Sequence, residues 1–237
     1  MRVATWNLER AAPESQAGVL QLATIEQAAA DAWVFTEAHE ALALPGYETT
    51  SSHPMLTIEP ARFATIAARS LRALPLPELP TGVAAIVAAN GRDWLVVGVC
   101  MPWRHDAPAL PSGAGGGATT GSEQWRAVLA CLDSALRRLL ALVPHKPLLL
   151  AGDFNQTLEG YVVGSRQGRT LLADLLSRHA LSAYTATEPS SLTGCYSIDH
   201  ICGPDDADAR ACTWKPALAG RSLRPITDHA GYLVSLT

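Results

Sequence analysis

The stretch Leu148-Leu149-Leu150-Ala151-Gly152-Asp153-Phe154-Asn155 decides the interpretation of this chain. An apolar run long enough for a buried strand ends at a glycine, and a carboxylate and a carboxamide follow it. Side chains at positions i and i+2 of an extended segment point the same way, so we expect Asp153 and Asn155 to leave the strand side by side. Proteins of the α/β class commonly build sites from polar groups at the ends of buried strands. The alternative is an Asp-X-Asn turn that only ends the strand.

Four further segments place polar side chains in or beside apolar, strand-like runs. They are Arg2 to Leu8 with Asn7, Ala32 to Glu37, Tyr196 to Ile201 with Asp199 and His200, and Pro225 to His229 with Asp228. A single carboxylate at a strand end is more often a turn or cap residue than a catalytic one. Five such segments, all rich in Asp, Asn, Glu and His, are hard to attribute to turn chemistry alone.

The residue types in these segments favour one kind of chemistry. Carboxylates such as Glu37, Asp153 and Asp228, without cysteine or paired histidine ligands, suit Mg²⁺ or Mn²⁺ and argue against zinc. Asparagine amides donate hydrogen bonds to phosphate oxygens or orient a water molecule. An aspartate that is hydrogen-bonded to a histidine ring fixes the tautomer of the imidazole and stabilises its protonated form. These groups together suit the attack of water on a phosphate ester.

The same motifs carry a family resemblance. In chain order they are Trp6-Asn7, Glu37, Gly152-Asp153-Phe154-Asn155, Ile198-Asp199-His200-Ile201 and Thr227-Asp228-His229. This series resembles the endonuclease/exonuclease/phosphatase superfamily, and the match runs from Arg2 to Leu236. The resemblance implies an α/β fold, a four-layer sandwich of two packed mixed β-sheets flanked by helices. Because the motifs draw on both ends of the chain, we expect one domain over residues 1–237.

The resemblance also implies a divalent-metal site. Glu37 would be the principal ligand of Mg²⁺ or Mn²⁺, with Asn7 and Asp228 beside it. Asp153 would orient or deprotonate the attacking water, and Asn155 would hold that water or a non-bridging phosphate oxygen. The implied activity is hydrolysis of a phosphate ester by a nuclease or a phosphatase.

A histidine–aspartate pair completes the implied site. Asp199 would pair with His229, and His229 would contact the scissile phosphate. The chain departs from the family pattern at Cys100, where relatives often carry a His or Tyr that assists at the phosphate. Nearby Trp103, or the Arg104-His105 pair that follows it, are candidates to take over that role.

Composition bounds the remaining possibilities. With 48% hydrophobic residues the chain can bury a sizeable core, but its longest apolar run, Leu139 to Ala151, is interrupted by Pro144-His145-Lys146-Pro147. That run is too short to span a bilayer, so no transmembrane segment is expected. No signal peptide follows Met1, and a cytoplasmic location is the default expectation. Five cysteines, an odd number with scattered spacing, argue against a disulfide framework or a zinc motif.

The charge balance bears on the substrate. A net charge of −4 and a pI near 6.0 argue mildly against a dedicated duplex-DNA enzyme, since nucleic-acid binders often carry a basic excess. Nucleic acid and small phosphorylated molecules both remain open as the phosphate-ester substrate. The alternative from another class is a non-catalytic or weakly active binding module that retains the fold, and its support is Cys100.

Apolar periodicity predicts three helices. They run from about Pro13 to Ala30, from an N-cap at Ser122 through Val143, and from Gly168 to His179. Residues 62–69, 83–89 and 94–100 are predicted strands, the last two joined through residues 90–93, where Asn-Gly favours a tight turn. The Gly-rich segment from Ala107 to Gly121 is expected to be a flexible linker, with a lid over the site as the alternative.

Overall fold

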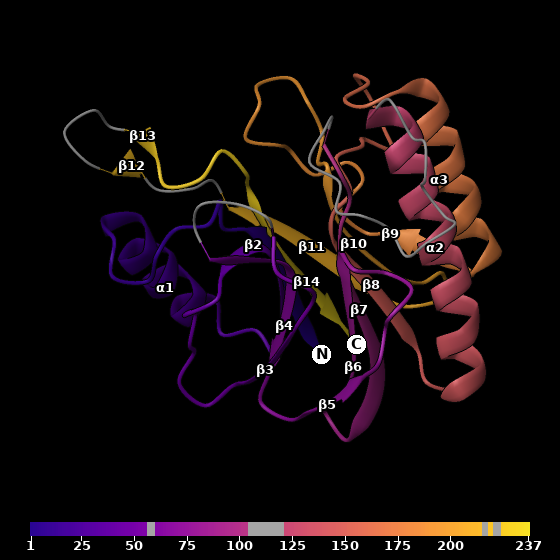
Figure 1. Ribbon diagram of the computed structural model, residues 1–237, viewed down its shortest axis with the longest axis horizontal. Coiled ribbons are helices and arrows are strands. Elements are labelled where there is room, and N and C mark those ends of the chain that lie inside the picture. Colours follow the sequence, from indigo (N-terminus) through magenta and orange to yellow (C-terminus); the bar gives the residue numbers. More distant parts are fainter. Residues whose placement is uncertain (56–59, 104–120, 215–217, 220–223) are drawn as a thin grey trace.

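Two six-stranded mixed sheets pack face to face, and helices cover their outer surfaces (Figure 1). The computed structural model describes residues 1–55, 60–103, 121–214, 218–219 and 224–237. In Figure 1 helix α1 covers one sheet, and helices α2 and α3 lie together over the other. The predicted four-layer α/β sandwich is confirmed.

The first sheet brings the two ends of the chain together. Its strand order is β11-β14-β1-β2-β4-β3, and only β1 and β2 run parallel. The strands are β1 (Arg2–Asn7), β2 (Ala32–His39), β3 (Glu48–Ser51), β4 (Ala61–Ala68), β11 (Ala209–Trp214) and β14 (Gly231–Leu236). The N-terminal strand therefore lies at the centre of the sheet, next to the C-terminal strand.

The second sheet contains the LLLAGD run as a central strand. Its order is β5-β6-β7-β8-β10-β9, and only β7 and β8 run parallel. The strands are β5 (Leu71–Leu74), β6 (Gly82–Ala89), β7 (Arg92–Cys100), β8 (Leu148–Asp153), β9 (Leu181–Ala183) and β10 (Asp199–Pro204). A small separate ribbon joins β12 (Leu218–Ala219) to β13 (Arg224–Pro225).

The three predicted helices are present with small shifts in their ends. They are α1 (Gln16–Ala28), α2 (Gly121–Leu142) and α3 (Arg166–Arg178). Ser15 and Ser165 cap α1 and α3, because each hydroxyl accepts the backbone N–H three residues later. Ser122 lies inside the first turn of α2, so its predicted role as N-cap is wrong. Within the described residues, no helix has the length and apolarity needed to cross a membrane.

The predicted hairpin between β6 and β7 has a tighter turn than expected. Ala89 pairs with Arg92, so only Asn90 and Gly91 form the turn, with φ values of 51° and 73°. Two consecutive positive φ angles match the right-handed twist of a two-residue hairpin, and Asn-Gly tolerates them. The predicted four-residue loop therefore ends early, and β7 begins at Arg92.

The apolar layer between the two sheets borders the carboxylates of the site. Val34 of the first sheet and Ala151 and Ile201 of the second belong to one buried apolar cluster between the two sheets. Alternate residues of a strand share a face, so Asp153 lies on the same face as Ala151, and Asp199 on the same face as Ile201. Both carboxylates are therefore placed where the inter-sheet core meets the ends of the strands.

Close approach of the sheets depends on a small residue in β7. A Cβ atom on Gly98 would lie 2.9 Å from Cγ1 of Val34 and 3.2 Å from Cγ1 of Val83. We expect Gly98→Val to overfill this layer and to lower the free energy of unfolding by about 1–3 kcal/mol. Urea unfolding monitored by circular dichroism measures the change. Ala88→Val, at an exposed position of β6, is the matched control, and an equal loss in both variants would contradict the packing argument.

Candidate active site

Three side chains form a row across the second sheet. Cys100 on β7 lies opposite Asp153 on β8, and Asp153 lies opposite Asp199 on β10. The two aspartates are only 1% and 2% exposed. Like charges directly opposite each other on neighbouring strands repel, so this pairing is stable only with compensation from other groups.

Asn7 reaches this row from the end of β1 in the facing sheet. Its Nδ2 donates to Oε1 of Glu37 at 3.2 Å and to Oδ2 of Asp153 at 3.1 Å. Its Oδ1 accepts the backbone N–H of Glu9 at 2.9 Å. The structure thus brings the expected ligands Asn7 and Glu37 together, with the amide nitrogen of Asn7 turned toward the carboxylates.

Glu37 departs from the regular alternation of β2. Phe35 and Trp33, two and four residues earlier, pack in the apolar cluster with α1, and strict alternation would send Glu37 to that side as well. Glu37 instead has a φ of 48°, and the pairing of β2 with β4 skips it. A left-handed backbone at a non-glycine residue costs about 1–3 kcal/mol and often marks a functional site. Here it accompanies a carboxylate that meets Asn7.

Arg10 is a site residue that the sequence analysis missed. Its Nε lies 3.5 Å from Oε2 of Glu37. Glu9 and Arg10 both have left-handed backbones, with φ values of 51° and 62°. The sequence analysis missed Glu9 as well, although Glu9 lies at the same i, i+2 spacing from Asn7 that singled out Asp153 and Asn155. No such spacing points to Arg10.

His229 is held between three carboxylates. Its Nδ1 lies 2.8 Å from Oδ2 of Asp199, and its Nε2 lies 3.4 Å from Oδ1 of Asp228 and 4.0 Å from Oδ2 of Asp153. Burial would lower the pKa of His229, but Asp199, and after it Asp153 and Asp228, raise that pKa well above its ordinary value. These carboxylates therefore favour the imidazolium form of the ring, in which both nitrogens can donate.

Asp153 lies at the centre of the site. Its Oδ1 accepts the backbone N–H of Asn155 at 2.8 Å. Burial, and secondly the charge of Asp199, raise the pKa of Asp153 to about 7. A carboxyl group with this pKa exchanges a proton near neutral pH, which suits a general base.

Asn155 holds the Asp153 carboxylate in position through its backbone N–H, and its side chain lies beside the same carboxylate. It has a φ of 51°, and its Nδ2 donates to the Met101 carbonyl at 2.9 Å. The same nitrogen lies 3.4 Å from Oδ2 of Asp153. The predicted pair therefore leaves the strand side by side, with the carboxamide tied to the segment that follows β7.

Asp228 occupies the solvent edge of the site, and its side chain is 73% exposed. It lies near Glu9, whose pKa is raised by burial and then by the charge of Asp228. The structure thus places Asp228 beside His229 and Glu9. The other expected metal residues, Asn7 and Glu37, lie on the Asp153 side.

The donor atoms fit a hard divalent cation. Among the described residues, two groups have donor atoms within 4.8 Å of one another: Glu37 with Cys100 and Asp153, and Asp153 with Asp199 and His229. Oδ1 of Asp199 is buried and has no hydrogen-bond partner within the described structure, although buried polar atoms are normally paired. Burial and then Asp153 raise the pKa of Cys100 well above its ordinary value, so the carboxylate oxygens are the ligands that suit Mg²⁺ or Mn²⁺.

Two candidates from the sequence lie outside the described residues. They are the Arg104-His105 pair and the Gly-rich segment from Ala107, of which only the final Gly121 is described, as the first residue of α2. Trp103 is described and is 42% exposed. Cys100 lies beside the Glu37 and Asp153 carboxylates.

The fold and the site together define a carboxylate–histidine centre at the open end of an α/β sandwich. The chain matches the model of the Endonuclease/Exonuclease/phosphatase family over residues 4–229, and it belongs to that family. Members of this superfamily are generally metal-dependent hydrolases of phosphodiester or phosphomonoester bonds. No curated protein sequence matches the chain.

Solved structures share the fold at low sequence identity. The endonuclease domain of TRAS1, a telomere-specific non-LTR retrotransposon, is 16% identical with a TM-score of 0.62, covering 99% of this chain and 97% of its own. The human Nocturnin catalytic domain with bound sulfate is 15% identical with a TM-score of 0.66, covering 100% and 94%. A family protein from Leptotrichia buccalis C-1013-b is 11% identical with a TM-score of 0.64, covering 100% and 99%.

The raised pKa of Asp153 predicts an unusual dependence of stability on pH. The folded protein keeps a proton, up to a pKa of about 7, that the unfolded chain releases near 3.8. Stability of the metal-free protein should therefore fall as the pH rises between about 4 and about 7, by at most roughly 4 kcal/mol. Urea unfolding in EDTA across this range measures the slope.

The slope should be smaller in Asp153→Asn, which has no carboxyl proton to release. Asp174→Asn, at an exposed position on α3, is the matched control and should keep the wild-type slope. Equal slopes in the wild type and Asp153→Asn would show that Asp153 is not the group responsible.

Proposed function

We propose that this protein is a divalent-metal-dependent hydrolase of phosphate esters that uses water activated by Asp153. The observation that carries the proposal is the environment of one atom. Oδ2 of Asp153 lies 3.1 Å from the Asn7 amide nitrogen and 4.0 Å from Nε2 of His229. A base, an amide donor and an imidazolium thus meet around the end of one buried strand.

Glu37 is the principal ligand in this proposal for Mg²⁺ or Mn²⁺. When bound, the cation would neutralise phosphate charge and stabilise the leaving oxygen. Asn7 holds the Glu37 carboxylate through Nδ2, and a ligand role for its Oδ1 requires release of the Glu9 N–H. Asp228, exposed beside His229 and Glu9, would supply a further carboxylate to the cation.

The chain's own residues perform the proton transfer and hold the phosphate. Asp153 takes a proton from water, the water oxygen forms the new bond to phosphorus, and the bond to the leaving ester oxygen breaks. Nε2 of the His229 imidazolium and the Asn155 amide donate to phosphoryl oxygens as negative charge develops. Asp199 keeps His229 oriented and protonated through the 2.8 Å bond to Nδ1. Solvent protonates the departing oxygen.

The competing proposal is a binding module that keeps the fold without activity. Cys100, at the position where relatives often carry His or Tyr, is the observation that favours it. Hydrolysis of bis-p-nitrophenyl phosphate, measured with Mn²⁺ and with EDTA, separates the two. Release of p-nitrophenol that depends on Mn²⁺ and increases with enzyme concentration supports the hydrolase, and its absence would support the module.

Glu37→Gln should remove most of this activity while the fold remains. The substitution is nearly isosteric but removes the negative charge that attracts the cation, so Mn²⁺ affinity should fall by more than about 100-fold. Isothermal titration with Mn²⁺ and circular dichroism measure binding and fold independently of turnover. Glu40→Gln, just beyond β2 and paired with Arg62, is the matched control. Wild-type Mn²⁺ affinity in Glu37→Gln would remove Glu37 from the ligand set.

His229 and Asp199 should act as one unit in turnover. Once the imidazole is removed, Asp199 has nothing left to orient, so His229→Ala with Asp199→Ala should cost little more in kcat than His229→Ala alone. A kinetic double-mutant cycle at saturating metal tests this coupling. Additive losses in kcat, accompanied by equal losses in melting temperature, would indicate that the pair has only a structural role.

A further inference from the structure

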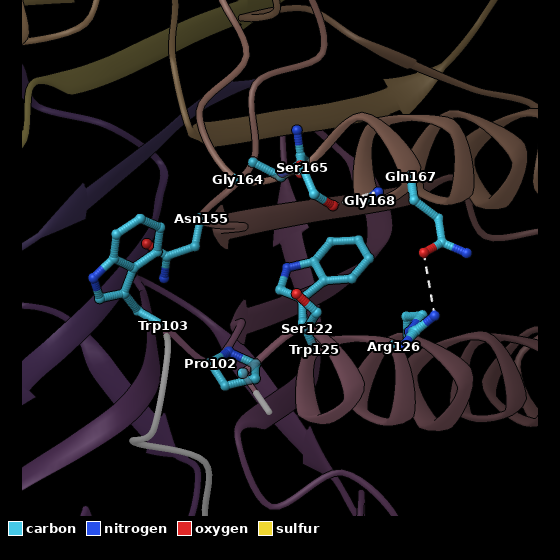
Figure 2. A pocket seen from close by; sticks show the side chains of 12 residues that line it. Pro102, Trp103, Ser122, Trp125, Arg126, Asn155, Gly164, Ser165, Gln167 and Gly168 are labelled. Atoms are coloured by element: carbon cyan, nitrogen blue, oxygen red, sulfur yellow. Dashed lines mark hydrogen bonds between the residues drawn. The ribbon is translucent and has the colours of Figure 1, made fainter. Parts of the chain in front are cut away.

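A cavity of about 420 Å³ opens beside the candidate site (Figure 2). It lies between the first turns of α2 and α3 and the Pro102-Trp103 segment that follows β7. Asn155 belongs both to its lining and to the site around Asp153. A substrate whose phosphate lies at Asp153 can therefore extend into this cavity.

The lining of the cavity differs in chemistry from the site itself. No carboxylate side chain lines it among the described residues, and Arg126 is the single charged residue in that lining. The other polar groups are serine hydroxyls and side-chain amides, including Ser122, Ser165 and Gln167. Hydroxyls and amides both donate and accept hydrogen bonds, so this lining suits a neutral group rich in polar atoms.

Two indole rings line the cavity, with Trp103 at one end and Trp125 near the middle in Figure 2. The Trp103 indole is 42% exposed and lies beside Asn155 in Figure 2. Trp125 is buried, and its Nε1 donates to the Phe154 carbonyl at 2.9 Å, which fixes the ring as a wall. A half-exposed indole at the mouth offers a flat face on which a planar group can stack.

Arg126 and Gln167 join the two helices at the end of the cavity away from Trp103. Nη1 of Arg126 donates to Oε1 of Gln167 at 3.1 Å, the dashed line in Figure 2. This contact bridges α2 to α3 and holds the positively charged Arg126 guanidinium beside the cavity. One arginine suits a singly charged neighbouring phosphate, whereas a ring carrying several phosphates needs more cations than the described part of this lining supplies.

The lining selects among the possible phosphate esters. Ser165 Oγ already accepts from the Gly168 N–H, and Gln167 Oε1 accepts from Arg126. An acyl chain would take the remaining hydroxyl and amide donors out of water without offering them an acceptor, which is costly. Among the described lining residues, a polyphosphorylated ring would meet a single arginine. A nucleobase satisfies the conditions together, because it is planar, uncharged and edged with donors and acceptors.

We propose that this cavity binds a nucleobase carried on the sugar next to the scissile phosphate, with the base stacked on Trp103. The proposal rests on the phosphoesterase function above and specifies its substrate as a nucleotide or a strand with an unpaired base. A base inside a duplex is already stacked and paired, so it cannot enter the cavity without leaving the helix.

Two esters with the same leaving group test the proposal. Thymidine 5′-(p-nitrophenyl phosphate) and methyl p-nitrophenyl phosphate both release p-nitrophenol, but only the first carries a base. The measured quantity is the ratio of their kcat/KM values with Mn²⁺. Trp103→Ala should lower this ratio by about 5- to 150-fold, the loss typical of one stacked base, and Trp103→Phe should largely retain it.

Tyr161→Ala is the matched control, because Tyr161 is an aromatic residue that is 71% exposed and lies outside the cavity lining. It should leave the ratio at the wild-type value. A ratio in Trp103→Ala equal to that in Tyr161→Ala would overturn the proposal. The activity of Trp103→Ala relative to the wild type is then measured on single-stranded oligothymidylate. If Trp103→Ala lowers kcat/KM on this strand, the base belongs to a nucleic-acid strand. If it lowers kcat/KM on the mononucleotide ester alone, the base belongs to a free nucleotide. A loss seen only on duplex DNA would overturn the proposal.

A binding measurement keeps this inference separate from the proposed activity. Isothermal titration of the Mn²⁺-loaded wild-type protein compares thymidine 5′-monophosphate with deoxyribose 5-phosphate, which lacks the base. Tighter binding of the nucleotide supports the nucleobase site even if no ester is hydrolysed. Equal binding overturns the nucleobase site even if bis-p-nitrophenyl phosphate is hydrolysed.

Discussion

Two buried carboxylates placed directly opposite each other, Asp153 on β8 and Asp199 on β10, are the constraint on which the site depends. Burial of Asp153, and secondly the charge of Asp199 opposite it, raise the pKa of Asp153 to about 7. The compensation comes from the facing parts of the chain. Asn7 donates to Asp153 from the first sheet, and His229 pairs with Asp199. The arrangement costs stability at neutral pH, and a bound divalent cation would offset that cost.

Sheet packing brings these groups to one place. Small residues such as Gly98 let the two sheets approach closely, and the alternation of each strand then sends Asp153 and Asp199 toward the facing sheet. The regular alternation of side chains along a strand does not direct every site residue toward the site. Glu37 and Asn155 adopt left-handed backbones at strand ends, so the chain accepts local strain to aim a carboxylate and an amide.

The site divides electrostatically into two regions. Around Asp153, the carboxylates of Glu37 and Asp199 create a negative centre suited to a cation, and Asp228 adds a carboxylate at the solvent edge. Beyond Asn155, the residues that the structure describes around the cavity are uncharged apart from Arg126. A phosphate ester fits this division, because its charged phosphoryl group belongs beside a cation and its uncharged substituent belongs in a lining of hydroxyls, amides and indole rings. Asn155 lies at the boundary and is tied to the Met101 carbonyl, just before the Pro102-Trp103 wall.

The sequence by itself determined the class of the fold through the family resemblance that its five motifs carry. It also determined the helices and most of the strands, because hydrophobic periodicity and the Asn-Gly turn signal are local. It also pointed to Asp153, Asp199 and His229, since polar residues at the ends of apolar runs stand out in one dimension. Tertiary structure alone decided that Asp199 lies opposite Asp153, that the amide nitrogen of Asn7 faces both carboxylates, and that Arg10 meets Glu37. It also separated Asp199 from its sequence neighbour His200, which is buried on the opposite face of β10 and held neutral, because burial lowers its pKa to about 4. The physical reason is that strand register, left-handed backbone angles and sheet packing bring together residues that are distant in the chain, and no local pattern encodes those distances.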